Sequence, residues 1–131
     1  MDKEEIDFQI KLSKNGCNYI SALFLYGILT ALQEKVMSVD DAEKLMLLPK
    51  YHSLAKNLNL HKNLIESISD GFDFDGILAL VPEHLDEAID AIKLKVKDII
   101  SKVDFSNSYM ELEYDKKNIE KSVVVIREVE A

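Results

Sequence analysis

The sequence predicts an α+β fold that is mainly helical, with about five helices around a buried central helix and a small three-stranded antiparallel sheet. Three observations predict this fold class. A long uncharged apolar segment lies near the N-terminus, several helical patterns follow it, and alternating patterns lie near both ends. A chain of 131 residues, 47% of them hydrophobic, can bury one core, so a single domain over residues 1–131 is predicted.

The first predicted element is a strand. Residues 5–12 alternate polar and apolar side chains, which is the period of a strand with one buried face. The apolar side chains of this strand are Ile6, Phe8, Ile10 and Leu12. Residues 13–16 (Ser-Lys-Asn-Gly) then supply a turn and a helix start. This N-terminal strand is expected to complete the sheet.

The central helix is predicted from about Cys17 to Val36. Its segment 15–33 contains no charged residue, and apolar side chains surround nearly the whole helix. Such a helix is either the centre of a globular core or a membrane span. A span needs about 20 apolar residues, whereas the apolar run from Tyr19 to Leu32 is shorter and contains small polar residues. The pattern therefore favours a buried helix in a water-soluble protein.

The next helix is predicted to start at Ser38, a suitable N-cap, with Asp40 and Asp41 in its first turn, where the helix dipole favours anions. Pro49 breaks this helix or starts a new one. The predicted apolar stripe of the helix consists of Leu45, Met46 and Leu48.

Two short helices are predicted over residues 50–58 and 61–69. Asp70-Gly71 is expected to end the second of them, with the glycine in a left-handed conformation. Asp73 is expected to cap a further short segment, and Pro82 to open the longest helix, which ends near Val103. The apolar side chains of the short segment are Ile77, Leu78 and Leu80.

A β-hairpin is predicted at the C-terminal end. Residues 109–114 alternate, residues 121–129 are rich in valine and isoleucine, and polar residues 115–118 separate the two. The segment 123–126 is expected to be the most buried strand. Because two strands alone are marginally stable, the N-terminal strand is expected to pair with them.

The formal net charge of −8 is the feature that bears most directly on partners. Such a surface repels phosphate backbones, which argues against nucleic-acid binding, and it attracts a basic protein. The acidic residues form two groups in the sequence, which we predict as partner-binding sites: Asp40, Asp41 and Glu43 in the first, and Glu83, Asp86, Glu87 and Asp90 in the second. The alternative is that each group is only a solvated helix face.

Signals for catalysis or metal binding are weak. His84 precedes Glu87 by three residues and could take part in acid–base chemistry. Residues 70–76 resemble a calcium loop, but two of the required carboxylates are absent from its frame. Cys17 could act as a nucleophile, although a core position is the simpler interpretation. We therefore predict no catalytic residue, metal or cofactor.

The single cysteine rules out an intrachain disulfide, and the acidic N-terminus does not resemble a secretion signal. Both features favour a cytoplasmic location.

The region from Ile20 to Lys102 resembles small, acidic, helical bacterial proteins of unassigned function. The resemblance lies in the order of an apolar helix, a Ser-x-Asp-Asp-Ala-Glu helix start, a proline break, an acidic turn and a Pro-Glu-x-Leu-Asp-Glu helix, within residues 22–49 and 67–92. In size and charge such proteins are similar to immunity proteins, which protect bacteria against secreted toxins. The resemblance assigns no catalytic residue.

These observations lead to one functional hypothesis and two alternatives. We expect a non-enzymatic cytoplasmic binding protein, an immunity-type inhibitor that masks a basic, nuclease-like toxin domain with its acidic patches. One alternative is a structural or regulatory module that forms a homodimer through the hairpin edge or an exposed apolar helix face. The other is a small enzyme that uses His84 and a carboxylate.

Overall fold

A computed structural model of the chain describes residues 7–102, 110–116 and 120–126, with side chains described from residue 11 to residue 102. The chain divides into two compact units. One unit comprises residues 1–17 and 103–131 and contains the strands, and the other comprises residues 18–102 and contains most of the helical residues. Each unit is described by itself below.

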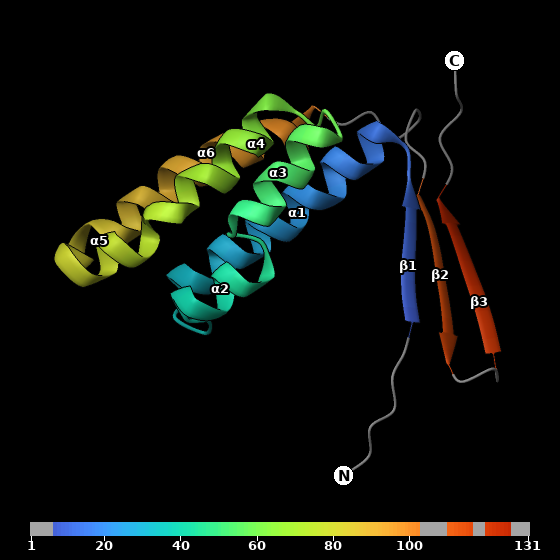
Figure 1. The fold of residues 1–131 in the computed structure, drawn as a ribbon, viewed down its shortest axis with the longest axis horizontal. Helices are drawn as coiled ribbons and strands as arrows, with labels where there is room; N and C mark the ends of the chain where they lie inside the picture. Colours follow the sequence, from blue (N-terminus) through green and yellow to red (C-terminus); the bar gives the residue numbers. More distant parts are fainter. Residues whose placement is uncertain (1–6, 103–109, 117–119, 127–131) are drawn as a thin grey trace, which may run out of the picture. The chain divides into compact units, whose positions relative to one another are not determined.

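The strand unit contains a three-stranded antiparallel sheet in the order β1-β2-β3 (Figure 1). The strands are β1 (Asp7–Leu12), β2 (Met110–Lys116) and β3 (Glu120–Ile126). In the register, Ile10 pairs with Leu112, and Leu112 pairs with Val124. Strand β2 is central, so the segment 123–126, predicted as the most buried strand, lies at an edge of this sheet. The burial of its side chains lies outside the described residues.

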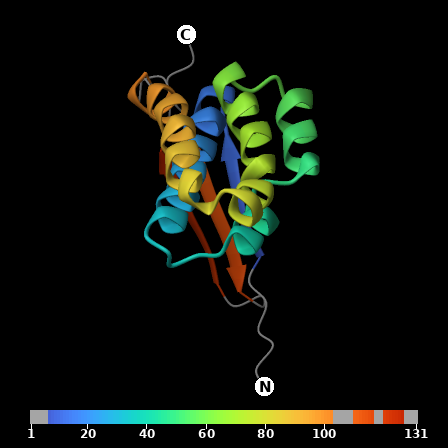
Figure 2. The same ribbon diagram turned by 90° about the vertical axis from the view of Figure 1, so that its left-hand side faces the viewer.

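The helical unit contains α-helices joined by short turns and two 3₁₀ segments. Helices α3, α4 and α6 lie in a row (Figure 2), with α4 between the other two. The elements in chain order are α1 (Lys14–Gln33), α2 (Val39–Leu45), α3 (Pro49–Asn57), α4 (Lys62–Asp70), η1 (Gly71–Asp73), α5 (Phe74–Leu80), η2 (Pro82–His84) and α6 (Leu85–Ser101).

Helix α1 begins and ends three residues earlier than predicted. It begins after Ser13, whose hydroxyl oxygen accepts a hydrogen bond from the backbone N–H of Gly16 at 3.0 Å. It ends because Lys35 adopts a left-handed backbone conformation with φ of 59°. The N–H of Val36 then donates to the carbonyl oxygen of Ala31 (3.1 Å), and the N–H of Lys35 donates to that of Leu32 (3.2 Å). This pair of bonds is a Schellman motif.

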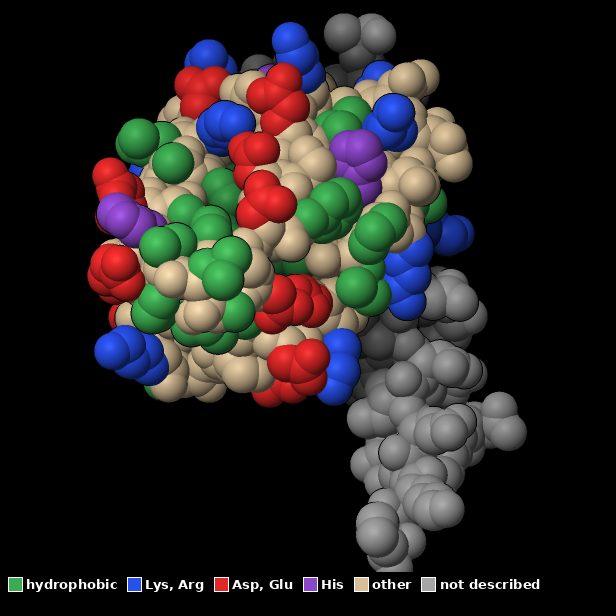
Figure 3. Space-filling model, turned by 60° about the vertical axis from the view of Figure 1, so that its left-hand side comes forward, with side chains coloured by type: hydrophobic (Ala, Val, Ile, Leu, Met, Phe, Trp, Pro, Cys, Tyr) green, Lys and Arg blue, Asp and Glu red, His purple; other side chains and the backbone are tan. Residues whose placement is uncertain are grey.

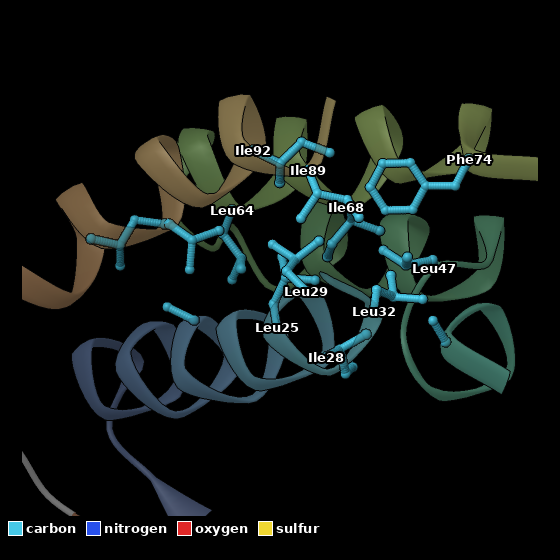
Figure 4. Packing of buried hydrophobic residues seen from close by; sticks show 14 of the residues in the cluster. Leu25, Ile28, Leu29, Leu32, Leu47, Leu64, Ile68, Phe74, Ile89 and Ile92 are labelled. Atoms are coloured by element: carbon cyan, nitrogen blue, oxygen red, sulfur yellow. The ribbon is translucent and has the colours of Figure 1, made fainter. Parts of the chain in front are cut away.

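The core of the helical unit lies between α1 and the row of helices. Figure 4 shows Leu25 and Leu29 of α1 directed towards Ile68 of α4 and Ile89 of α6. Phe74, at the start of α5, closes one end of this cluster and is fully buried. Burying a large apolar side chain contributes about 1.5–3 kcal/mol, so this cluster accounts for much of the stability of the unit.

The structure corrects the predicted fold class in three respects. The described residues contain six α-helices and two 3₁₀ segments rather than about five helices. The predicted central helix is not surrounded on all sides, because Leu23 and Phe24 of α1 are 40% and 50% exposed. In addition, the sheet lies in one compact unit and every helical residue after residue 17 lies in the other, so the unit of residues 18–102 is all-α rather than α+β.

The structure also corrects two predicted apolar stripes. In α2 the buried side chains are Val39 and Ala42, and Leu45 is exposed. The short segment after Asp73 buries Phe74, whereas Leu80 is 82% exposed. Both elements are short helices of seven residues, so a shift of one residue in phase changes which side chains face the core.

Gly71 has a different role from the one predicted. Its φ of −70° and ψ of −14° are right-handed, so it does not end α4 through a left-handed conformation. Instead, a Cβ atom at this position would lie 2.6 Å from Cδ2 of Leu47, a side chain that is 2% exposed. The glycine allows the chain to pass closely over Leu47.

We therefore expect Gly71→Ala to destabilise the protein by about 1–3 kcal/mol, because Leu47 must leave its packed position. Gly76→Ala is the matched control, since a Cβ atom there meets nothing within 4 Å and alanine favours a helix by about 1 kcal/mol. Urea unfolding monitored by circular dichroism measures both. Equal stability of the two variants would contradict the close approach at Gly71.

Candidate functional site

The candidate site is an open pocket of about 690 Å³ in the helical unit. Its walls come from the segment that joins α1 to α2, from α5, from η2 and from the first turn of α6. The apolar lining includes Leu32, Val36, Leu78 and Leu85. Figure 3 shows the face at the α5 end of the unit, where hydrophobic side chains gather with acidic side chains around them. Glu83 and Asp86 also line the pocket, so it combines apolar walls with carboxylates.

The C-terminal end of α1 shapes one wall of this pocket. The left-handed conformation of Lys35 turns the chain away from the helix and leaves Val36 76% exposed. In a Schellman motif the residue at the position of Val36 frequently packs back on its own helix. Here it lies instead at the pocket, beside Lys35, which is the only cationic side chain lining this pocket.

The first acidic group lies at the start of α2. Ser38 caps the helix as predicted, because its hydroxyl oxygen accepts a hydrogen bond from the backbone N–H of Asp41 at 3.1 Å. Ser38 and Val39 line the pocket, which places Asp40 and Asp41 next to its wall in the chain. Asp40 forms an ion pair with Lys44 at 3.2 Å, between two well-exposed side chains.

The second acidic group lies in η2 and the first half of α6. Glu83 of η2 and Asp86 of α6 line the pocket and are exposed. Oε2 of Glu87 lies 3.3 Å from Nδ1 of His84. The Asp90 carboxylate accepts a hydrogen bond of 2.5 Å from the side-chain amide of Gln33 in α1. Within residues 11–102, Glu83 and Asp86 have neither an ion pair nor a side-chain hydrogen bond, so their carboxylates face solvent at the pocket.

The structure thus brings Glu83 and Asp86 to the same pocket as Ser38 and Val39, which lie more than 40 residues earlier in the sequence, but Asp40, Asp41 and Glu43 are not among the lining residues. Asp90 is not among the lining residues and is held against Gln33 of α1. The exposure of Val36 and Leu78 was not predicted from the sequence. The run Leu-Ala-Leu-Val-Pro at residues 78–82 contained a usable signal, because adjacent apolar residues cannot all face one side of a helix.

Glu43 belongs to the first acidic group but faces α5. A hydrogen bond with the Asp75 side chain raises the pKa of Glu43 to about 7 from its ordinary value of 4.5, and burial and the negative charges of Asp75 and Asp40 act in the same direction. The Glu43 carboxyl group therefore takes up a proton when the protein folds at mildly acidic pH. This pair links α2 to α5.

We expect this pair to make folding pH-dependent. Between pH 4.5 and 7 the folded protein binds a proton at Glu43 that the unfolded chain releases, so this contribution to the free energy of unfolding falls as pH rises. Glu43→Gln retains a donor to Asp75 but does not ionise. Its stability relative to the original protein should therefore increase from pH 4.5 to pH 7, as measured by urea unfolding at several pH values. Parallel pH profiles of the two proteins would contradict this prediction.

The histidines and Asp70 take part in separate local interactions. The side chain of His61 accepts a hydrogen bond from the N–H of Asn63 at 3.0 Å, and His52 packs edge-on against Phe72. His84 is exposed beside Glu87. Asp70, the first acidic residue of the calcium-like segment, forms a 2.7 Å ion pair with Lys95. No group of three or more potential metal ligands occurs among the described residues.

Among the described helices, none combines the length and the apolar character that crossing a bilayer requires.

Comparison with known proteins places the chain in a family. Residues 13–115 match the family described as "Protein of unknown function (DUF3969)". The chain belongs to this family. The match covers all the helices from α1 to α6, so the pocket lies entirely within the DUF3969 region. This membership confirms the resemblance to a family of unassigned function. No curated protein and no solved structure matches the sequence.

Proposed function

We propose that this DUF3969 protein is a non-enzymatic, cytoplasmic binding protein that docks a basic protein partner on its pocket face. The observation that carries the proposal is the combination of Glu83 and Asp86 with the exposed apolar side chains of Val36 and Leu78 around one pocket. Interfaces between proteins typically pair a desolvated apolar centre with a polar rim. The pocket face offers both parts.

Electrostatics supports a basic partner. The net charge of −8 attracts cationic surfaces over distances up to about the Debye length of 8–10 Å. Unpaired carboxylates such as those of Glu83 and Asp86 orient an approaching basic surface, and such rim charges mainly raise the association rate. Carboxylates already paired with lysines, such as Asp40 with Lys44, contribute less to this attraction.

The specific form of this function that we propose is immunity-type inhibition of a nuclease-like toxin domain. A nuclease binds phosphates through lysine and arginine side chains. A protein that covers this basic surface with carboxylates removes the site at which the substrate would bind. Inhibition of this kind requires no catalytic group in the inhibitor.

The test uses the purified protein encoded by the open reading frame next to the gene for this chain. If the chain is an immunity protein, that reading frame is expected to encode the toxin. We expect a complex at 50 mM salt that weakens as salt is raised to 500 mM, together with loss of nuclease activity in the complex. Surface plasmon resonance and a plasmid-cleavage assay measure the two effects. Absence of a complex at low salt would contradict the proposed function.

A further inference from the structure

We propose that the pocket accepts the apolar face of an amphipathic helix from the partner, with lysine or arginine side chains along one edge of that helix. This inference rests on the proposed function and specifies what occupies the pocket. We choose a helix as the occupant because a helix in a groove presents side chains at positions i and i+4, and two such side chains can enter one pocket together. The carboxylates of Glu83 and Asp86, which line the pocket from η2 and α6, are complementary to basic side chains along one edge of this helix.

The apolar walls supply the first argument. Leu32, only 6% exposed, lines the pocket together with the exposed side chains of Val36 and Leu78 and the half-buried Leu85. Leaving apolar side chains of this size in water is unfavourable, and a ligand that covers them gains free energy in proportion to the apolar area that it buries. An apolar ligand surface is the chemical match for these walls.

The distribution of charge supplies the second argument, because it fixes the chemistry of the helix edges. Glu83 and Asp86 belong to η2 and α6, whereas Lys35 belongs to the segment that joins α1 to α2. A helix with lysines on both edges would place some of them against Lys35. A helix with lysines on one edge only can pair with Glu83 and Asp86 and avoid this repulsion.

Three synthetic peptides test the inference on the full chain. The first is a 16-residue alanine-based helix with two leucines four positions apart and four lysines along one neighbouring edge. In the second peptide the leucines are replaced by alanine, and in the third the lysines are replaced by glutamate. Fluorescence anisotropy should show binding of the first peptide at 50 mM salt, with affinity about tenfold lower or worse for the second peptide and for the third.

Variants of the protein locate the binding. We expect Leu78→Ser and Val36→Ser each to weaken binding of the first peptide several-fold, because both remove apolar wall. Leu54→Ser is the matched control, since Leu54 of α3 is 54% exposed, lies outside the pocket lining and resembles Leu78 at 45%. Two pocket variants are used so that a folding defect in one of them, detected by circular dichroism, still leaves the test decisive.

The outcomes separate the two proposals. Equal binding of the first two peptides would overturn the apolar-helix inference, while salt-dependent binding of the basic protein partner would still support the proposed function. An equal loss in Leu54→Ser and Leu78→Ser would also overturn the inference, because the pocket would then have no special role. Failure of the basic protein itself to bind would instead overturn the proposed function.

Discussion

Phe74→Ala is expected to destabilise the protein by about 3–5 kcal/mol, which is the usual cost of removing a fully buried aromatic ring. Phe74 has no exposed surface and closes one end of the cluster between α1 and the row of helices. Typical stabilities of small proteins are about 5–15 kcal/mol, so this single change removes a large share. Urea unfolding followed by circular dichroism measures the loss.

Phe24→Ala provides the matched control for this prediction. Phe24 is half exposed on α1, at 50%, so the same chemical change should cost about 1 kcal/mol or less. A loss at Phe24 as large as that at Phe74 would contradict the observed packing, because it would mean that the outer face of α1 is buried in solution. The pair therefore also tests the correction to the predicted central helix.

Neutralising two pocket carboxylates, Glu83→Gln with Asp86→Asn, is expected to reduce the association rate with a basic partner by about tenfold or more. Electrostatic attraction raises association rates by about 10–10³-fold, and these two side chains stand unpaired at the pocket within the described part of the chain. The dissociation rate should change less, since rim charges act mainly on the approach. Stopped-flow fluorescence at 50 mM salt separates the two rates.

The control variant changes the same number of charges elsewhere. Glu66→Gln with Asp98→Asn neutralises two carboxylates that pair with lysines, Glu66 with Lys62 and Lys95, and Asp98 with Lys102. Asp98 lies 12 residues beyond Asp86 on α6, a distance of about 18 Å along the helix axis. If both double variants slowed association equally, net charge alone would govern the encounter and the pocket face would lose its role.

The sequence predicts the buried face of a long helix more accurately than the boundaries and buried faces of short elements. The long helix α6 buries residues at the spacings of three and four that its sequence displays, such as Ile89, Ile92 and Val96. Its start was less accurate, because Pro82 begins a separate 3₁₀ turn rather than α6 itself. Long repeated patterns average out local exceptions, whereas an element boundary depends on a few backbone hydrogen bonds.

The candidate site was only partly predictable for a related reason. Charge patterns identified Glu83 and Asp86, but no local pattern indicates that η2 and the start of α2 flank one pocket. That proximity arises from tertiary packing. The exposure of Val36 could not be predicted from the sequence either. It depends on the left-handed conformation of Lys35, which turns the chain there and which is unusual for a lysine and more typical of glycine.

The most direct test of the pocket face as the docking surface is amide hydrogen exchange with and without the basic protein partner at low salt. We predict that protection on binding is concentrated in residues 32–39 and 78–86, the two segments that form the pocket walls. Protection confined to α3 and α4, with no change in either pocket segment, would contradict the assignment.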